Sequence, residues 1–158
     1  MHSAIKLDSG QIDAFQRLLA QGADVDERDE TLKTPLHVAS YDGKLEIAKT
    51  LIEYGADVNS RDNEGWTPLH WAAPNGLVDL SRLLLDNGAD INATERGGDT
   101  ALHIASGHGK LESVRFLLGQ GASVKIRNLY GRTASQCVPL DGHREIAQLF
   151  SEYDVSGA

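Results

Sequence analysis

Apolar residues recur along the chain at the spacing of amphipathic helices, and this spacing itself returns at intervals of 33 residues. In each copy the apolar positions lie on one helical face, which we predict to pack inward. A glycine follows each copy, at 55, 88 and 121, and is expected to end the helix. The inward positions are Leu45, Ile47, Leu51 and Ile52, then Val78, Leu80, Leu84 and Leu85, then Leu111, Val114, Leu117 and Leu118.

A shorter helix is predicted before each of these segments. The segment Thr67-Pro68-Leu69-His70-Trp71-Ala72-Ala73 shows its pattern most fully. Threonine serves as the N-cap, because its hydroxyl can accept a hydrogen bond from a backbone N–H of the first turn. Proline follows at the first helical position, where its missing N–H costs nothing. Glycines at 43, 76 and 109 are expected to end this helix with a positive φ.

The repeated motif identifies a family resemblance. It occurs also as Thr34-Pro35-Leu36-His37-Val38-Ala39-Ser40 and Thr100-Ala101-Leu102-His103-Ile104-Ala105-Ser106, and it resembles the ankyrin repeat over nearly the whole chain. The resemblance implies an all-α solenoid of stacked helix-turn-helix units with projecting β-hairpin loops. We expect a single domain with an opening helix pair at 1–26, full repeats at 27–59, 60–92 and 93–125, and a closing repeat at 126–158.

The two end units are predicted to differ from the middle ones, because one face of each meets water instead of a neighbour. A first helix is expected at 4–10 of the opening unit, and Gln136 replaces the motif histidine in the closing unit. The apolar positions predicted to face the rest of the protein are Ile12, Ala14, Phe15, Leu18 and Leu19 in the opening unit and Ile146, Leu149 and Phe150 in the closing unit.

Two residues break the repeated pattern. Pro74 falls near the end of a first helix, where proline removes a backbone hydrogen bond and crowds the preceding turn, so we expect this helix to end early or bend. Because Gly107 and Pro139 occupy related places, irregular ends are expected in these helices generally. Leu32 stands where the other hairpins have a turn glycine, at 65, 98 and 131, so either its turn differs or the leucine packs.

Charge narrows the function. The 158 residues include 15 basic and 23 acidic side chains, for a formal net charge of -8. This balance argues against nucleic-acid binding, which needs a basic stripe to neutralise phosphates. No apolar run approaches the roughly 18 residues of a membrane helix, no secretory signal is visible, and Cys137 has no second cysteine to pair with. We expect a cytoplasmic monomer, with the nucleus left open, that binds neither nucleic acid nor membrane.

His37, His70 and His103 recur with the period and are the candidates for a metal site. One histidine per stacked unit places them about 10 Å apart, whereas zinc ligands lie about 2 Å from the metal. The favoured interpretation is structural. Each imidazole then bridges backbone groups of a helix and an adjoining hairpin, as the resemblance also implies. We expect no metal ligand among them.

An enzyme is the less favoured alternative: a small hydrolase or transferase whose site uses Ser106, His108 or Cys137. The sequence contains neither a nucleophile elbow nor a nucleotide-binding glycine motif. Cys137 takes the place of an apolar helix residue and is interpreted as a small filler. We therefore expect no catalytic residue, no cofactor and no enzymatic activity.

The resemblance implies that a partner protein binds the concave face built from hairpin tips and first helices. Trp66 is the main candidate, because a tryptophan at an exposed tip buries a large apolar area when a partner arrives; its alternative is packing against the neighbouring hairpin. Trp71, on a helix, is expected in the core or half in it. The other residues carried over to this face are Lys33, Tyr41, Asp42, Glu64, Asn75, Asp99, His108, Tyr130 and Arg132.

Further alternatives concern origin and modification. In one, the chain is a regulatory or targeting module cut from a larger protein; in another, it is an engineered repeat scaffold without a native partner. Asn59 and Asn92 occupy places where the resemblance implies that asparagine can be hydroxylated. The plainer interpretation, which we favour, is that each asparagine side chain bonds its own turn.

Overall fold

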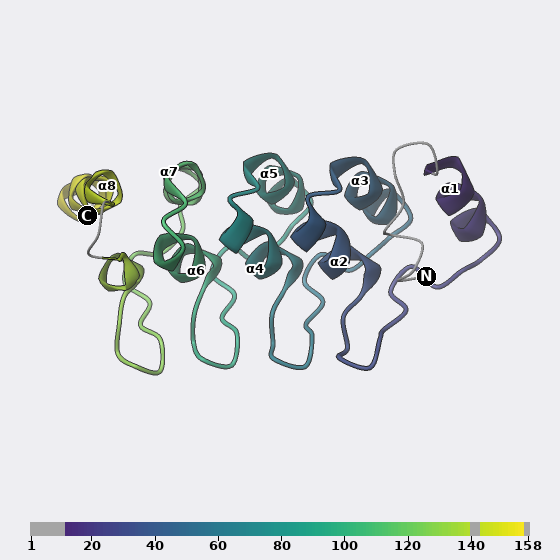
Figure 1. Cartoon of the computed structure of the whole chain (residues 1–158), viewed down its shortest axis with the longest axis horizontal. Helices are drawn as coiled ribbons and strands as arrows, with labels where there is room; N and C mark the ends of the chain where they lie inside the picture. The colour runs from purple at the N-terminus through teal and green to yellow at the C-terminus, as the bar shows by residue number, and fades with distance from the viewer. Residues whose placement is uncertain (1–11, 140–142, 157–158) are drawn as a thin grey trace.

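Paired helices stack into one elongated row in the computed structural model, which describes residues 12–139 and 143–156 (Figure 1). α1, α3, α5, α7 and α8 form one layer, and α2, α4, α6 and the short helix η4 form a second layer from which the loops project. No strand occurs in these two ranges, so the predicted all-α stacked architecture is confirmed. The elements are α1 (Ile12–Ala20), α2 (Pro35–Asp42), α3 (Leu45–Glu53), α4 (Pro68–Ala72), the 3-10 helix η3 (Ala73–Asn75), α5 (Val78–Asp86), α6 (Ala101–Gly107), α7 (Leu111–Gly119), the 3-10 helix η4 (Ala134–Cys137) and α8 (Arg144–Ser156).

The core is a continuous apolar layer between the two layers of helices. Small alanines on the first helices are fully buried and let neighbouring helices approach closely, while leucines fill the space between them. Complete burial of one leucine stabilises a fold by about 1.5–3 kcal/mol. A single helix pair cannot cover its own apolar face, so each unit depends on the next for stability. Members with 2% exposure or less include Leu36, Ala39, Leu51, Leu69, Ala72, Leu84, Leu102, Ala105, Val114 and Leu117.

Pro74 alters its helix as predicted. α4 contains only five residues, Pro68–Ala72, and the chain then tightens into the 3-10 helix η3, Ala73–Asn75. The proline has no N–H for an α-helical bond, and a 3-10 turn accommodates its ring. The wider expectation of irregular helix ends is wrong for α6, because its α-helical hydrogen bonding continues through Gly107.

Every hairpin turn contains one residue in the left-handed region. Gly65, Gly98 and Gly131 have φ values of 80°, 80° and 71°, and Leu32 has a φ of 61° at the same place. Both expectations for Leu32 are therefore wrong, since its turn does not differ and its side chain is 45% exposed. A left-handed leucine costs about 1–2 kcal/mol, so the first turn carries strain that the others avoid. The glycines expected to end helices also have positive φ: Gly43, Gly55, Gly76, Gly88, Gly109 and Gly121.

The opening unit departs from one prediction. Leu19 is buried against the row, but Leu18 is 44% exposed, so its predicted inward orientation is wrong. Among the described helices, α3 is the main one that α1 contacts. The apolar residues of α8 are buried as predicted: Ile146, Leu149 and Phe150. Outside the described part lie the helix expected at 4–10 and the side chains of Ile12, Ala14 and Phe15.

Candidate functional site

Hairpins at 29–33, 62–66, 95–99 and 128–132, called the first to fourth hairpins below, stand side by side beneath the helices (Figure 1). Adjacent hairpins are joined through their tips, each pair by one backbone hydrogen bond of 2.8 to 3.0 Å. The bonds run from the N–H of Asn63 to the carbonyl of Thr31, from Arg96 to Glu64, and from Leu129 to Gly97. The tips therefore keep a fixed spacing and present a preformed surface.

One buried carboxylate organises the second hairpin. Asp62 Oδ1 accepts hydrogen bonds from the N–H groups of Glu64 and Trp66, both at 2.9 Å, and Oδ2 accepts from Trp71 Nε1 at 3.0 Å. The carboxylate thus fixes the turn and ties it to α4. Asn128 holds the equivalent place in the fourth hairpin, where its Oδ1 accepts from the N–H groups two and four residues later, each at 3.0 Å.

The three periodic histidines link each helix to the following hairpin. In His70, Nδ1 accepts a hydrogen bond from the Thr67 N–H at 3.1 Å, and Nε2 lies 3.1 Å from the Asp99 carbonyl. Because Nδ1 is an acceptor, the imidazole proton resides on Nε2 and is donated to that carbonyl. The predicted structural role is confirmed. His37 and His103 repeat the arrangement, with Thr34 and the Trp66 carbonyl in one case and Thr100 and the Arg132 carbonyl in the other.

Burial favours the neutral form of His37 and His70. Desolvation lowers the pKa of His37 and of His70 below the ordinary value of 6.5. The expected bond from a first-turn amide to the threonine hydroxyl is formed in α6, at 3.4 Å between His103 N–H and Thr100 Oγ1. Thr34 and Thr67 make no such side-chain cap bond, so the prediction is wrong for α2 and α4. The described residues include no group of three or more His, Cys, Asp or Glu side chains placed to hold a metal ion.

Tyr41, Trp66 and Trp71 form an aromatic cluster on the side of the hairpins. The Trp66 and Trp71 ring centroids lie 5.1 Å apart, and Tyr41 meets Trp71 edge-on at 5.4 Å. Lys33 Nζ lies 4.4 Å from the centroid of Trp71, within the range of a cation–π contact. Asn75 Nδ2 donates to the Tyr41 carbonyl at 2.8 Å, which joins the end of η3 to the end of α2.

A cleft of about 290 Å³ opens between the first and second hairpins beside this cluster. Trp66 and Trp71 supply its apolar wall, while the exposed Glu64 stands at its margin. Trp66 is half-buried because it packs on α4 of its own unit, against Trp71 and, at 6.1 Å, His70. It is therefore neither a fully exposed tip nor a residue packed mainly on the neighbouring hairpin. Thr31, Lys33, Asp62 and Asn63 complete the lining.

The structure brings together Lys33, Tyr41, Trp66 and Asn75 among the predicted binding residues. Trp71 is half-buried, as expected, and contacts Lys33, Tyr41 and Trp66. It was not among the residues predicted for the site. The signal was available, because an aromatic residue there replaces the smaller apolar side chains of the other repeats. Glu64 lines the same cleft and is exposed. The remaining predicted residues are spread along the row: Asp42, His108, Tyr130 and Arg132 are exposed, and Asp99 is half-buried.

Two of those remaining residues have structural partners. Asp99 Oδ1 accepts from Asn128 Nδ2 at 2.8 Å, so its carboxylate joins the third hairpin to the fourth. His108 Nδ1 lies 2.9 Å from the Ile104 carbonyl within its own helix end. Sequence reasoning also missed Leu129, which is 79% exposed at the tip of the fourth hairpin. An apolar residue at a tip position that is polar in the other hairpins was the signal for it.

Asn59 and Asn92 bond the following unit, so the favoured interpretation of a bond within their own turn is wrong. Asn59 Oδ1 accepts from the Asp90 N–H at 2.8 Å, and its Nδ2 donates to the Gly88 carbonyl at 2.9 Å. Asn92 Oδ1 accepts from the Ser123 N–H at 2.9 Å. Hydroxylation of either asparagine stays a prediction, and an enzyme would have to reach amides that hold neighbouring repeats together.

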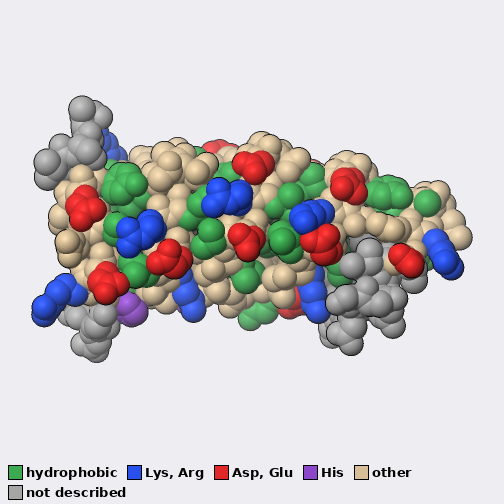
Figure 2. Space-filling model, turned by 90° about the horizontal axis from the view of Figure 1, so that it is seen from above, with side chains coloured by type: hydrophobic (Ala, Val, Ile, Leu, Met, Phe, Trp, Pro, Cys, Tyr) green, Lys and Arg blue, Asp and Glu red, His purple; other side chains and the backbone are tan. Residues whose placement is uncertain are grey.

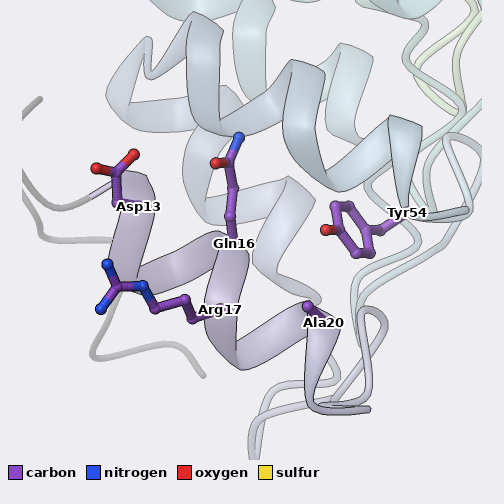
Figure 3. Close-up of a pocket in the computed structure, with 5 residues that line it drawn as sticks. All are labelled: Asp13, Gln16, Arg17, Ala20 and Tyr54. Carbon is purple, nitrogen blue, oxygen red and sulfur yellow. The ribbon is translucent and has the colours of Figure 1, made fainter.

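The opposite side of the molecule offers a different kind of surface. Lysine, arginine, aspartate and glutamate lie interspersed over the helices that face the viewer in Figure 2, with no block of one sign. Near the opening unit, Asp13, Gln16, Arg17 and Ala20 of α1 line a shallow hollow together with Tyr54 at the end of α3 (Figure 3). Asp13 and Arg17 lie on the side of α1 away from Tyr54 in this view, so their charges do not converge in the hollow.

Two residues of the enzyme alternative, Ser106 and Cys137, lack the surroundings of an activated nucleophile. Ser106 is completely buried, and its hydroxyl has no hydrogen-bond partner in the described part of the chain. Burial raises the pKa of the half-buried Cys137 thiol, which lowers the fraction of reactive thiolate.

Among the described residues, no helix is long and apolar enough to cross a membrane.

Comparison with known families agrees with this geometry. A family model described as ankyrin repeats in three copies matches residues 1–95, which is more than half of the 158 residues. A second, described as ankyrin repeats in many copies, matches residues 75–118. No curated protein matches the sequence. With its 33-residue period, stacked helix pairs and histidine links, the chain belongs to the ankyrin repeat family.

Proposed function

We propose that this protein is a non-catalytic module that binds a partner protein through the concave face of its hairpin tips and first helices. Ankyrin repeats generally serve as protein–protein interaction modules. The aromatic cluster is the observation that carries the proposal here: Tyr41 is 50% exposed, and it adjoins the half-buried Trp66 and Trp71 beside the cleft. Tryptophan and tyrosine in such settings contribute a large share of binding energy at interfaces.

The surface is suited to binding because it is already ordered. Hydrogen bonds between tips, the Asp62 carboxylate and the histidine links hold the hairpins in place, so little conformational entropy is lost when a partner binds. Exposed Glu64 lines the cleft beside the aromatic cluster, and its carboxylate favours a partner with a basic group next to an apolar anchor.

Two exposed tyrosines provide the test. Tyr41 is 50% exposed in the aromatic cluster, and Tyr54 is 45% exposed at the end of α3, so the pair matches in chemistry and exposure but not in location. Each variant, Tyr41→Ala and Tyr54→Ala, serves as immobilised bait beside the wild-type chain, and retained proteins are quantified by mass spectrometry. We expect Tyr41→Ala to weaken capture about tenfold, equivalent to about 1.4 kcal/mol, and Tyr54→Ala to leave it unchanged. A fourth bait carries Trp66→Ala. Equal recovery of the same proteins by the wild type and by all three variants would contradict the proposal.

The proposal extends to the oligomeric state and the cellular location of the protein. We propose a monomer in the cytoplasm, supported by the unpaired Cys137 and by the interspersed charges of the outer face. The strained Leu32 turn and the helix shortened at Pro74 are irregularities that favour a natural repeat over an idealised scaffold.

A further inference from the structure

Among the described residues, the fourth hairpin is the last in the ladder of backbone hydrogen bonds that joins the hairpin tips. In each earlier hairpin one tip carbonyl accepts an N–H of the next hairpin, and Tyr130 holds the corresponding place in the fourth. Among the described residues, no backbone N–H donates to the Tyr130 carbonyl. The outer edge of this hairpin therefore offers the same acceptor that the inner edges use.

Two side chains of the closing unit, Gln136 and Arg127, occupy the places of side chains that bind the following unit in earlier repeats. Gln136 Oε1 accepts from the Thr133 N–H at 3.0 Å, as the Nδ1 atoms of the motif histidines do, so its amide nitrogen replaces the donor Nε2–H. Arg61 Nη1 donates across to the Thr94 carbonyl of the next unit at 2.7 Å. Arg127, two periods later, donates at 2.7 Å to Gly131 of its own hairpin.

Exposure and charge both single out this hairpin. Leu129 and Tyr130 are 79% and 82% exposed, more than any other large apolar side chain in the described residues. Residues 113–140 contain no aspartate or glutamate, although the whole chain has a net charge of -8. Exposed basic side chains in or beside the hairpin are Lys125, Arg127 and Arg132, whereas Arg115 of the same stretch lies on α7, 4.0 Å from Glu112. A basic, apolar edge thus ends an acidic row.

We propose that the outer edge of the fourth hairpin binds an acidic, extended segment of a partner protein by strand addition. An N–H of the segment donates to the Tyr130 carbonyl, and one of its carbonyls accepts from the Gln136 amide, as a following hairpin would. An apolar side chain of the segment covers Leu129, and carboxylates face Arg127 and Arg132. A nucleic acid would match the charges alone, whereas a peptide also matches the backbone groups and the apolar tip.

Titration of the ¹⁵N-labelled full chain with a blocked peptide of eight alternating glutamates and valines tests the proposal. We expect amide shifts confined to residues 125–136. The same peptide with every backbone nitrogen methylated should bind about tenfold more weakly, because it cannot donate to the ladder. A peptide of alternating lysines and valines should cause no shifts.

Charge-reversal variants supply the matched control. Arg132→Glu should weaken binding of the acidic peptide about tenfold, from one lost attraction and one added repulsion. Arg96→Glu makes the same change at an exposed residue of the third hairpin and should have no effect. Tyr41→Ala should also have none, so this edge is tested separately from the concave face. Shifts centred on Trp66, unchanged binding after methylation, or tighter binding of single-stranded oligothymidylate to residues 125–136 would overturn the proposal.

Discussion

A pair of glycines separates the cost of a left-handed backbone from the cost of crowding two hairpins. Gly98 and Gly131 occupy the same turn position, with φ values of 80° and 71°. A Cβ on Gly131 would meet nothing within 4 Å, whereas one on Gly98 would lie 3.0 Å from Asn128 Cα and 3.1 Å from Leu129 N. These are backbone atoms of the fourth hairpin, which the bond from Leu129 to the Gly97 carbonyl holds in place.

The expected losses follow from these contacts. A left-handed alanine costs about 1–2 kcal/mol, and the reduced freedom of the unfolded chain offsets about 0.4–1 kcal/mol of that. Gly131→Ala should therefore lower the free energy of unfolding by about 1 kcal/mol. Gly98→Ala adds overpacking of about 1–3 kcal/mol, for a total of about 2–4 kcal/mol.

Urea unfolding followed by two probes measures the difference. Trp66 and Trp71, the only tryptophans, report on the second hairpin and α4, while far-UV circular dichroism reports on all helices. Gly131→Ala should shift both midpoints together. Gly98→Ala should separate them, because the closing unit detaches first once its contact with the third hairpin is weakened. Equal losses for the two variants, with coincident midpoints, would refute the rigid contact between the hairpins.

Three further predictions concern buried polar groups. Burial lowers the pKa of His37 and His70 below 6.5, so below about pH 6.5 the unfolded chain takes up protons that the folded chain does not, and stability should fall as the pH drops. Urea midpoints between about pH 5 and 8 measure this fall, and His70→Gln should make the midpoint depend less on pH. Ser106→Ala should raise the free energy of unfolding by about 1 kcal/mol, since it removes a buried hydroxyl without a partner and the second full repeat already has Ala73 there; a thermal midpoint no higher than that of the wild type would contradict this. Asp62→Ala should cost about 3 kcal/mol and shift tryptophan emission to the red, because three hydrogen bonds that hold the aromatic cluster are lost; unchanged emission would show that the cluster does not depend on this carboxylate.

Sequence periodicity predicted the helices well because their causes are local. Apolar spacing, threonine caps and terminal glycines act within one unit, and the 33-residue period repeats them in register. Pro74 likewise acts on its own helix, so its effect was predictable. Leu32 was not, because the hydrogen bonds around the first turn hold it in a left-handed conformation that leucine disfavours by itself.

The candidate site was predicted only in part, because contacts between units decide it. Family position alone placed Tyr41 and Trp66 on one face, but the contact of Trp66 with Trp71 depends on how the second hairpin folds onto α4. Asn59 was misjudged for the same reason, since its partner Gly88 belongs to the next unit. The sequence of a single repeat does not show which backbone groups of the following repeat lie within hydrogen-bond distance.

The histidine links have a consequence for chain length. Each one spans from a helix to a carbonyl 29 residues later, and the next begins one period on, as with His37 to Trp66 and His103 to Arg132. A chain spliced from Trp66 directly to Thr100 would keep both of these links with their own partners. Removing one period of 33 residues should therefore give a shorter protein with the same links, whereas an internal deletion inside a link that is not a whole number of periods would leave an imidazole facing the wrong atom.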